Sequence, residues 1–182
     1  MLQKPRLIVY LILTASMMVS IYGIAIASGK QSDETGTSKS VPVEGWQLSA
    51  KADPKNLVAG GKINLDLTVT NMSEDTKSFT DIFSVEYQFE LKVTDSDGEP
   101  VNLTPKGRTR QTNPPWGHIY VIPFKPDQTK KYVRTVSEEY DLTKPGVYFV
   151  TVSYRLHDDD KGHIVRLVSN TVNLLVRQPT TK

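Results

Sequence analysis

The residues best suited to binding chemistry lie in a polar, basic and proline-containing stretch at positions 104–117. Lys106, Arg108 and Arg110 are spaced by polar residues there, and Trp116 follows two prolines. Basic side chains attract anionic groups, and tryptophan and arginine supply much of the energy at protein interfaces. Long loops commonly carry binding residues, so we expect this stretch to be a binding loop. The alternative is that Trp116 packs over one end of the domain and the basic residues are simply solvated.

A second cluster, between residues 157 and 163, contains side chains of the kinds that bind metal ions. The candidate ligands are His157, Asp158, Asp160 and His163, and neutral imidazole suits zinc, copper or nickel. However, the spacing matches no calcium-loop signature, and an aspartate-rich tip that ends in Lys-Gly is also a good solvated turn. We therefore predict a hairpin turn here, with no metal ion and no cofactor.

Catalysis has little support in the sequence. The chain has no cysteine and only three histidines, so thiol catalysis, disulfides and cysteine-type zinc sites are excluded. It also has no Gly-x-Ser-x-Gly motif and no His-Glu-x-x-His motif, which position the reactive groups of common hydrolases. We predict that the protein is not an enzyme.

The first 27 residues resemble an export signal. Lys4 and Arg6 precede an uncharged apolar run at 7–27, which ends in the small-x-small pattern Ala-Ile-Ala and is followed by Ser28. We predict cleavage after Ala27. The run of about 21 residues is close to the ~20 that span a bilayer, so an uncleaved membrane anchor is the alternative. In either case the rest of the chain is expected to be exported, to the periplasm, the cell surface or the medium.

The charge of the exported part argues against nucleic acid as a partner. The formal net charge of +2 is carried by Lys4 and Arg6, because residues 1–27 hold no acidic side chain. The remainder is neutral, and a neutral chain has no electrostatic attraction to a polyanion. We expect the partner to be a protein or a cell-envelope polymer. Membrane contact is expected only through the N-terminal segment, if that segment is not cleaved.

Short runs of alternating apolar and polar residues predict β-strands that each bury one face. These runs lie at 46–50, 63–69, 85–93, 101–103, 119–124, 132–136, 148–154 and 170–176. Turn residues separate them, and Pro123 confines its strand to a sheet edge or a bulge. Seven to nine short strands without a helical period predict an all-β protein, a single antiparallel two-sheet sandwich.

The predicted domain organisation places that sandwich at 44–177. Residues 28–43 hold almost no apolar side chain to bury, so we expect a disordered linker between the signal or anchor helix and the sandwich. Residues 178–182 form a polar tail.

Three segments carry a resemblance to a known family: 58–71 with its Gly-Gly turn and alternating strand, 87–101 with its Asp-Ser-Asp-Gly turn, and 145–148 with Pro-Gly-Val-Tyr. They are similar to bacterial immunoglobulin-like sandwiches that include the intracellular proteinase inhibitor (BsuPI-like) family. Tyr148 resembles the tyrosine corner of such folds, in which the hydroxyl bonds to backbone a few residues upstream.

Three functions follow as expectations. The first is an exported, non-enzymatic interaction module of the cell envelope or extracellular space. The second is a protease inhibitor that uses 104–117 as a bait loop, with Arg108 or Arg110 in the cleavage position. The third is an accessory carbohydrate-binding module.

Overall fold

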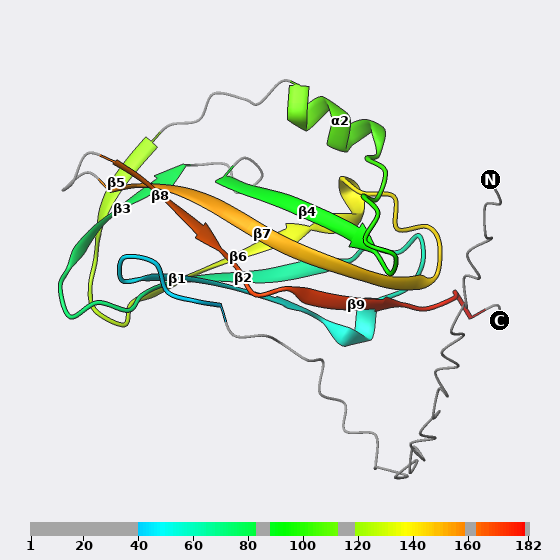
Figure 1. The fold of residues 1–182 in the computed structure, drawn as a ribbon, viewed down its shortest axis with the longest axis horizontal. Coiled ribbons are helices and arrows are strands. Elements are labelled where there is room, and N and C mark those ends of the chain that lie inside the picture. Colours follow the sequence, from blue (N-terminus) through cyan, green and yellow to red (C-terminus); the bar gives the residue numbers. More distant parts are fainter. Residues whose placement is uncertain (1–39, 83–87, 113–118, 159–162, 181–182) are drawn as a thin grey trace, which may run out of the picture. The chain divides into compact units, whose positions relative to one another are not determined.

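The computed structural model describes residues 40–82, 88–112, 119–158 and 163–180 (Figure 1). The chain divides into a unit at Met1–Asp33 and a unit at Glu34–Lys182, and all described residues belong to the second. The predicted signal or anchor segment, Trp116 and Asp160 lie outside the described residues. No helix within the described ranges is long and apolar enough to cross a membrane.

The described residues form a mostly β structure with one α-helix. The strands are β1 (Trp46–Ala52), β2 (Asn64–Asn71), β3 (Lys77–Ile82), β4 (Phe89–Asp95), β5 (Ile119–Phe124), β6 (Thr129–Thr135), β7 (Gly146–Asp158), β8 (His163–Val168) and β9 (Val172–Val176). The helix α2 spans Pro105–Thr112, and two short 3-10 helices, η1 (Pro54–Asn56) and η2 (Val136–Glu138), lie in connections. The prediction of an antiparallel all-β domain is confirmed at this level.

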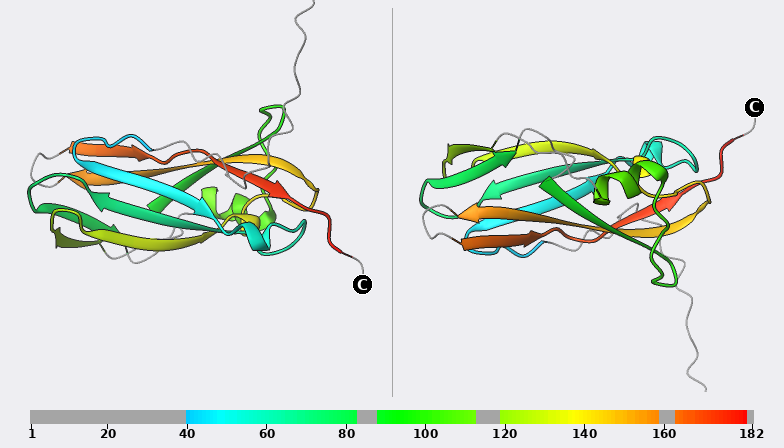
Figure 2. Two further views of the ribbon diagram at one scale, coloured as in Figure 1. Left: turned by 90° about the horizontal axis from the view of Figure 1, so that it is seen from below. Right: turned by 90° about the horizontal axis from the view of Figure 1, so that it is seen from above.

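The strands form two facing antiparallel layers, which Figure 2 shows from two sides. One layer has the order β1-β2-β6. The other has the order β4-β7-β8, and β9 pairs with β7 beside β8. The strands β3 and β5 pair with each other, and β3 contacts β7. Strand β1 packs across the layers against β7, β8 and β9.

Alternation along the strands explains which side chains reach the core. In β7, the apolar positions from Tyr148 to Leu156 at every second residue are all buried. Trp46 of β1 packs against two phenylalanines, with its ring centroid 5.6 Å from that of Phe79 and 5.6 Å from that of Phe124. Burial of each large apolar side chain contributes about 1.5–3 kcal/mol. The strands are therefore held by one shared apolar interior.

The predicted tyrosine corner is present at the start of β7. Tyr148 is buried, and its hydroxyl donates a hydrogen bond to the carbonyl oxygen of Lys144 at 2.9 Å. The bond spans the Pro-Gly turn that precedes the strand, so it fixes the chain direction on entry into β7.

A buried asparagine ties the two layers together between β8 and β9. The side-chain oxygen of Asn170 accepts a hydrogen bond from the Ala50 amide at 2.9 Å. Its side-chain nitrogen donates to the Ala50 carbonyl, also at 2.9 Å. Both backbone groups of Ala50, in the middle of β1, are thus satisfied by one side chain rather than by a neighbouring strand.

Several sequence predictions differ from the structure. Strands β3 and β8 were not expected, because their apolar residues do not alternate cleanly with polar ones. Residues 101–103 were expected to return as a strand of a hairpin, but only single bridges form there, from Thr94 to Pro100 and from Leu103 to Tyr140. The long strand expected from residue 85 begins, in the described part of the chain, at Phe89.

Candidate functional site

The stretch expected to be a binding loop contains the helix α2, so the expected loop conformation was wrong for residues 105–112, while their role in binding stays a prediction. Thr104 caps the helix: its hydroxyl oxygen accepts a hydrogen bond from the Gly107 amide at 3.0 Å. Pro105 follows at the first helical position, where its missing N–H costs nothing. The Thr104 hydroxyl also donates to the Glu138 carbonyl at 2.6 Å. The cap therefore both starts the helix and fixes it to η2.

Helix α2 rests on the rest of the domain through backbone and charge rather than through apolar side chains. Its only buried residue is Gly107. A Cβ atom at this position would lie 2.2 Å from the carbonyl oxygen of Glu139. Glycine is therefore required for the helix backbone to come this close to the residues after η2.

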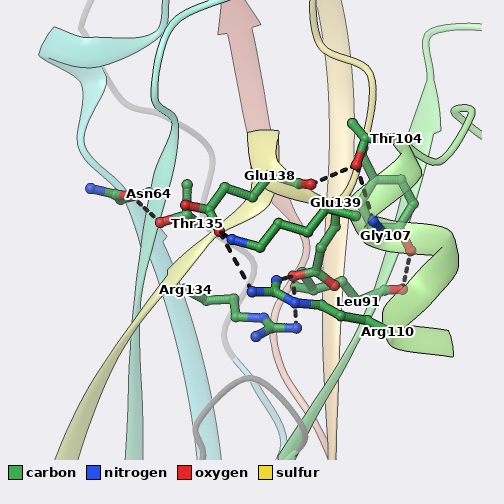
Figure 3. A network of polar contacts seen from close by, with 11 residues as sticks. Asn64, Leu91, Thr104, Gly107, Arg110, Arg134, Thr135, Glu138 and Glu139 are labelled. Atoms are coloured by element: carbon green, nitrogen blue, oxygen red, sulfur yellow. Dashed lines mark hydrogen bonds and ion pairs between the residues drawn. The ribbon is translucent and has the colours of Figure 1, made fainter. Parts of the chain in front are cut away.

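Ion pairs hold two of the three basic side chains of α2 (Figure 3). Arg110 lies 2.8 Å from the Glu139 carboxylate, and Arg134 of β6 lies 2.7 Å from the same carboxylate oxygen. Lys106 pairs with Glu138, and Arg110 approaches Glu138 at 3.5 Å. The side chains of Arg110, Arg134 and Glu139 are largely buried. Two of the three expected binding cations are thus in ion pairs within the protein.

The two neighbouring carboxyl groups have pKa values displaced in opposite directions. Burial raises the pKa of the Glu139 carboxyl, because desolvation outweighs the attraction of Arg134 and Arg110. A hydrogen bond from Lys106, together with the charges of Lys106 and Arg110, lowers the pKa of the exposed Glu138 carboxyl. Of the two carboxyl groups, the buried one, Glu139, is the one whose ionised form is energetically unfavourable in the folded protein.

Two adjoining clefts lie beside α2. Their volumes are about 500 and about 570 Å³. Both are lined by Glu90, Leu91, Gln111, Tyr140 and Ser153, so they meet along β4. We call this combined depression the β4 groove.

The two halves of the β4 groove differ in chemistry. The first half has apolar walls from Pro100, Val101, Leu103 and Val168. The second half is polar and of mixed charge, with Arg110, Arg134, Arg155 and His157 in its lining beside Glu90 and Glu139.

The floor of the first half is a polar ladder that crosses three strands. Arg166 of β8 lies 3.2 Å from the Ser153 hydroxyl and 3.4 Å from the Glu90 carboxylate. Ser153 of β7 also donates to Glu90 of β4 at 3.3 Å. At the edge of β4, the Tyr140 hydroxyl donates to the Leu91 carbonyl at 2.5 Å. Donors, acceptors and both signs of charge are available here, which suits binding of a polar chain.

The expected binding residues divide into three groups. Arg110 lines the β4 groove. Lys106 and Arg108 are not among the residues that line either half, and Arg108 donates to the Leu103 carbonyl at 2.7 Å. Trp116 lies outside the described residues, so its expected role remains a prediction.

Sequence reasoning did not single out Arg134 or Glu139. A signal was available, because Arg134 falls in phase with the buried Tyr132 of β6 and with the buried Val136 that follows the strand. A charged side chain on a buried face needs a partner of opposite charge, so the pattern indicated that Arg134 forms a buried ion pair.

The candidate metal ligands lie at the ends of β7 and β8. His157 pairs in register with Ile164, and Asp158 pairs with His163. The His163 ring nitrogen Nε2 lies 3.0 and 3.1 Å from the two carboxylate oxygens of Glu44. Within the described ranges, no three histidine, aspartate or glutamate side chains are grouped so that they could hold a metal ion.

Comparisons with known proteins identify no family. No protein-family model and no curated protein matches the chain. Similar solved structures include a target of the Northeast Structural Genomics Consortium, at 13% identity and a TM-score of 0.40, covering 78% of this chain and 98% of the other. The bacterial hydrophobin BslA matches at 11% identity and a TM-score of 0.34, over 78% of this chain and 100% of its own. A β-glucuronidase of Bacteroides uniformis matches at 12% identity and a TM-score of 0.31, over 70% of this chain and 12% of the enzyme. None of these likenesses assigns a function.

Proposed function

We propose that the protein is an exported, non-enzymatic binding module that holds a protein segment or a cell-envelope polymer in the β4 groove. The observation that carries the proposal is the groove itself. Each half has a volume within the range of about 300–1,000 Å³ that is usual for ligand sites. Its apolar walls and polar floor provide both contact area and orientation.

We further propose that the sandwich is immunoglobulin-like. The facing layers β1-β2-β6 and β4-β7-β8 correspond to the A-B-E and C-F-G strands of that fold. Tyr148 supports the correspondence, because β7 would be the F strand and its first residues carry the tyrosine corner.

We propose that the protein is exported, because residues 1–27 resemble an export signal. If the signal is cleaved after Ala27, N-terminal sequencing of secreted protein will begin at Ser28. Full-length protein in the membrane fraction would instead support the anchor.

The inhibitor alternative receives less support than the groove. A bait segment binds in extended form, as a strand added to its target. Arg108 and Arg110 lie in a helix, and the guanidinium group of Arg110 is held by Glu139. The carbohydrate-binding alternative concerns the same groove and is separated from protein binding by the test below.

The test uses the chain from Ser28 to Lys182 with one groove variant and one matched control. Val168 is 45% exposed and lines the groove, whereas Leu175 is 55% exposed on β9 and does not. Capture is measured separately with purified cell-wall polysaccharide and with envelope proteins. We expect Val168→Arg to lose capture and Leu175→Arg to keep it. Equal capture by wild type and Val168→Arg would show that the groove is not the binding site.

A further inference from the structure

Strand β5 has the features of an edge that pairs with another chain. In the described part of the chain it pairs with β3 on one side only (Figure 1). None of its six residues is charged. Tyr120 is 51% exposed and Val121 is 55% exposed, although both are large apolar residues. An exposed, uncharged edge strand is a template for a further strand.

The backbone groups of Val121 point away from β3. Val121 lies opposite Thr80 in the antiparallel pair, and the Thr80 carbonyl accepts a hydrogen bond from the Tyr154 hydroxyl of β7. That carbonyl is therefore directed to β7 and not to β5. Opposite residues of an antiparallel pair direct their backbone groups alike, either toward each other or both outward. Val121 thus presents its N–H and C=O at the outer edge.

The position of Pro123 independently indicates that these backbone groups face the outer edge of β5. It lies two residues from Val121, and so on the same edge. Proline has no N–H and is tolerated where the missing donor would have faced outward. The ladder between β3 and β5 therefore loses no hydrogen bond at Pro123.

We propose that β5 pairs antiparallel with β5 of a second copy of this chain, about a twofold axis at Val121. This register places Val121 opposite Val121, Tyr120 opposite Ile122 and Ile119 opposite Pro123. The two Val121 residues exchange two hydrogen bonds, and each Ile119 amide donates to a Pro123 carbonyl. Each Ile119 carbonyl gains no bond in return, because Pro123 has no N–H, so the pairing is held by four interchain hydrogen bonds rather than six. The two β3–β5 pairs become one four-stranded sheet.

The sequence of β5 favours its own copy as the occupant. A twofold interface brings one patch against itself, so any charge would meet a like charge. The strand carries none, and its exposed Tyr120 and Val121 would be covered by equally apolar neighbours. The proposal does not depend on the β4 groove, because no residue of β5 lines either half of it.

The first test is the oligomeric state of the chain from Ser28 to Lys182, measured by analytical ultracentrifugation from micromolar to millimolar concentration. We expect a dimer fraction that rises with concentration. Val121→Lys should remain monomeric, because two lysines would face each other at the axis. Val133→Lys is the matched control, since Val133 is 59% exposed on β6. It should dimerise as wild type does, and circular dichroism checks that both variants are folded.

The second test uses the absence of cysteine in the chain. In the proposed register the two Val121 Cα atoms are about 5.5 Å apart, which a short thiol-specific bismaleimide cross-linker can bridge. Val121→Cys should therefore be cross-linked into a dimer by that reagent, and Val133→Cys should not. The proposal is wrong if wild type is monomeric at every concentration, if Val121→Lys dimerises normally, or if the two cysteine variants cross-link equally.

Discussion

The contact between Gly107 and Glu139 allows a sharp test of how α2 is held. In Gly107→Ala the new Cβ would meet the Glu139 carbonyl oxygen at 2.2 Å, its carbon at 2.9 Å and its Cα at 3.0 Å. These are backbone atoms and cannot rotate away. Restoring ordinary contact requires α2 to retreat by about 1 Å. Such a shift would stretch the 2.8 Å contact between Arg110 and Glu139.

The sign of the effect is what makes the substitution informative. In a free helix, glycine to alanine stabilises by about 1 kcal/mol. Overpacking of a close contact costs about 1–3 kcal/mol, and the weakened ion pairs add to that cost. We expect Gly107→Ala to lower the free energy of unfolding by about 1–3 kcal/mol, the reverse of its effect on an isolated helix.

Denaturant unfolding measures the loss, and hydrogen exchange of the amides at 105–112 shows whether α2 has detached. Thr109→Ala is the control, because Thr109 is exposed on the same helix and its change brings no clash. It should alter stability by no more than about 0.5 kcal/mol. If Gly107→Ala is as stable as wild type and its α2 amides exchange at the same rate, α2 is not docked through this contact.

Three further outcomes follow from the buried polar groups. Tyr148→Phe removes the hydrogen bond of the hydroxyl at the turn and should lower the free energy of unfolding by about 1 kcal/mol, and Tyr148→Ala should lower it by about 3–5 kcal/mol. Denaturant melts equal to those of wild type would contradict a stabilising role for the tyrosine corner. Asn170→Ala leaves the N–H and C=O of Ala50 unsatisfied, at about 1–3 kcal/mol each, whereas the exposed Asn173→Ala should be near neutral in the same melts. The raised pKa of Glu139 means that its stabilising contribution is fully present below its ordinary pKa of 4.5 and is lost as pH rises through the folded-state value. The stability of wild type relative to Glu139→Gln should therefore be greater at pH 4 than at pH 7, and an unchanged difference would refute the shift.

The strands with one face on the core could be predicted from the sequence. Alternation identified β2 and β7, because each presents every second residue to the interior. Local chemistry identified two further features, the corner at Tyr148 and the edge position of Pro123. These depend on a few neighbouring residues, so a single sequence contains the information.

Helix α2 and its ion pairs could not be predicted in the same way. The helix has no apolar side chain, so it shows no helical period, and only Thr104-Pro105 indicated its start. Its docking depends on Glu139, which is 29 residues from Arg110 in the chain. Pairing at that separation is set by the tertiary fold rather than by local pattern.

The single side-chain link from Asn170 to Ala50 has a mechanical consequence. Strand β1 is the first strand after the proposed linker, so tension on the linker would enter the domain at Trp46. Peeling of β1 from β2 would begin at that end, where Trp46 pairs with Asn71. It would then reach Ala50, which Asn170 holds from the opposite side. We expect β1 to detach under load in two steps, with a pause at Ala50 that the Asn170→Ala variant would lack.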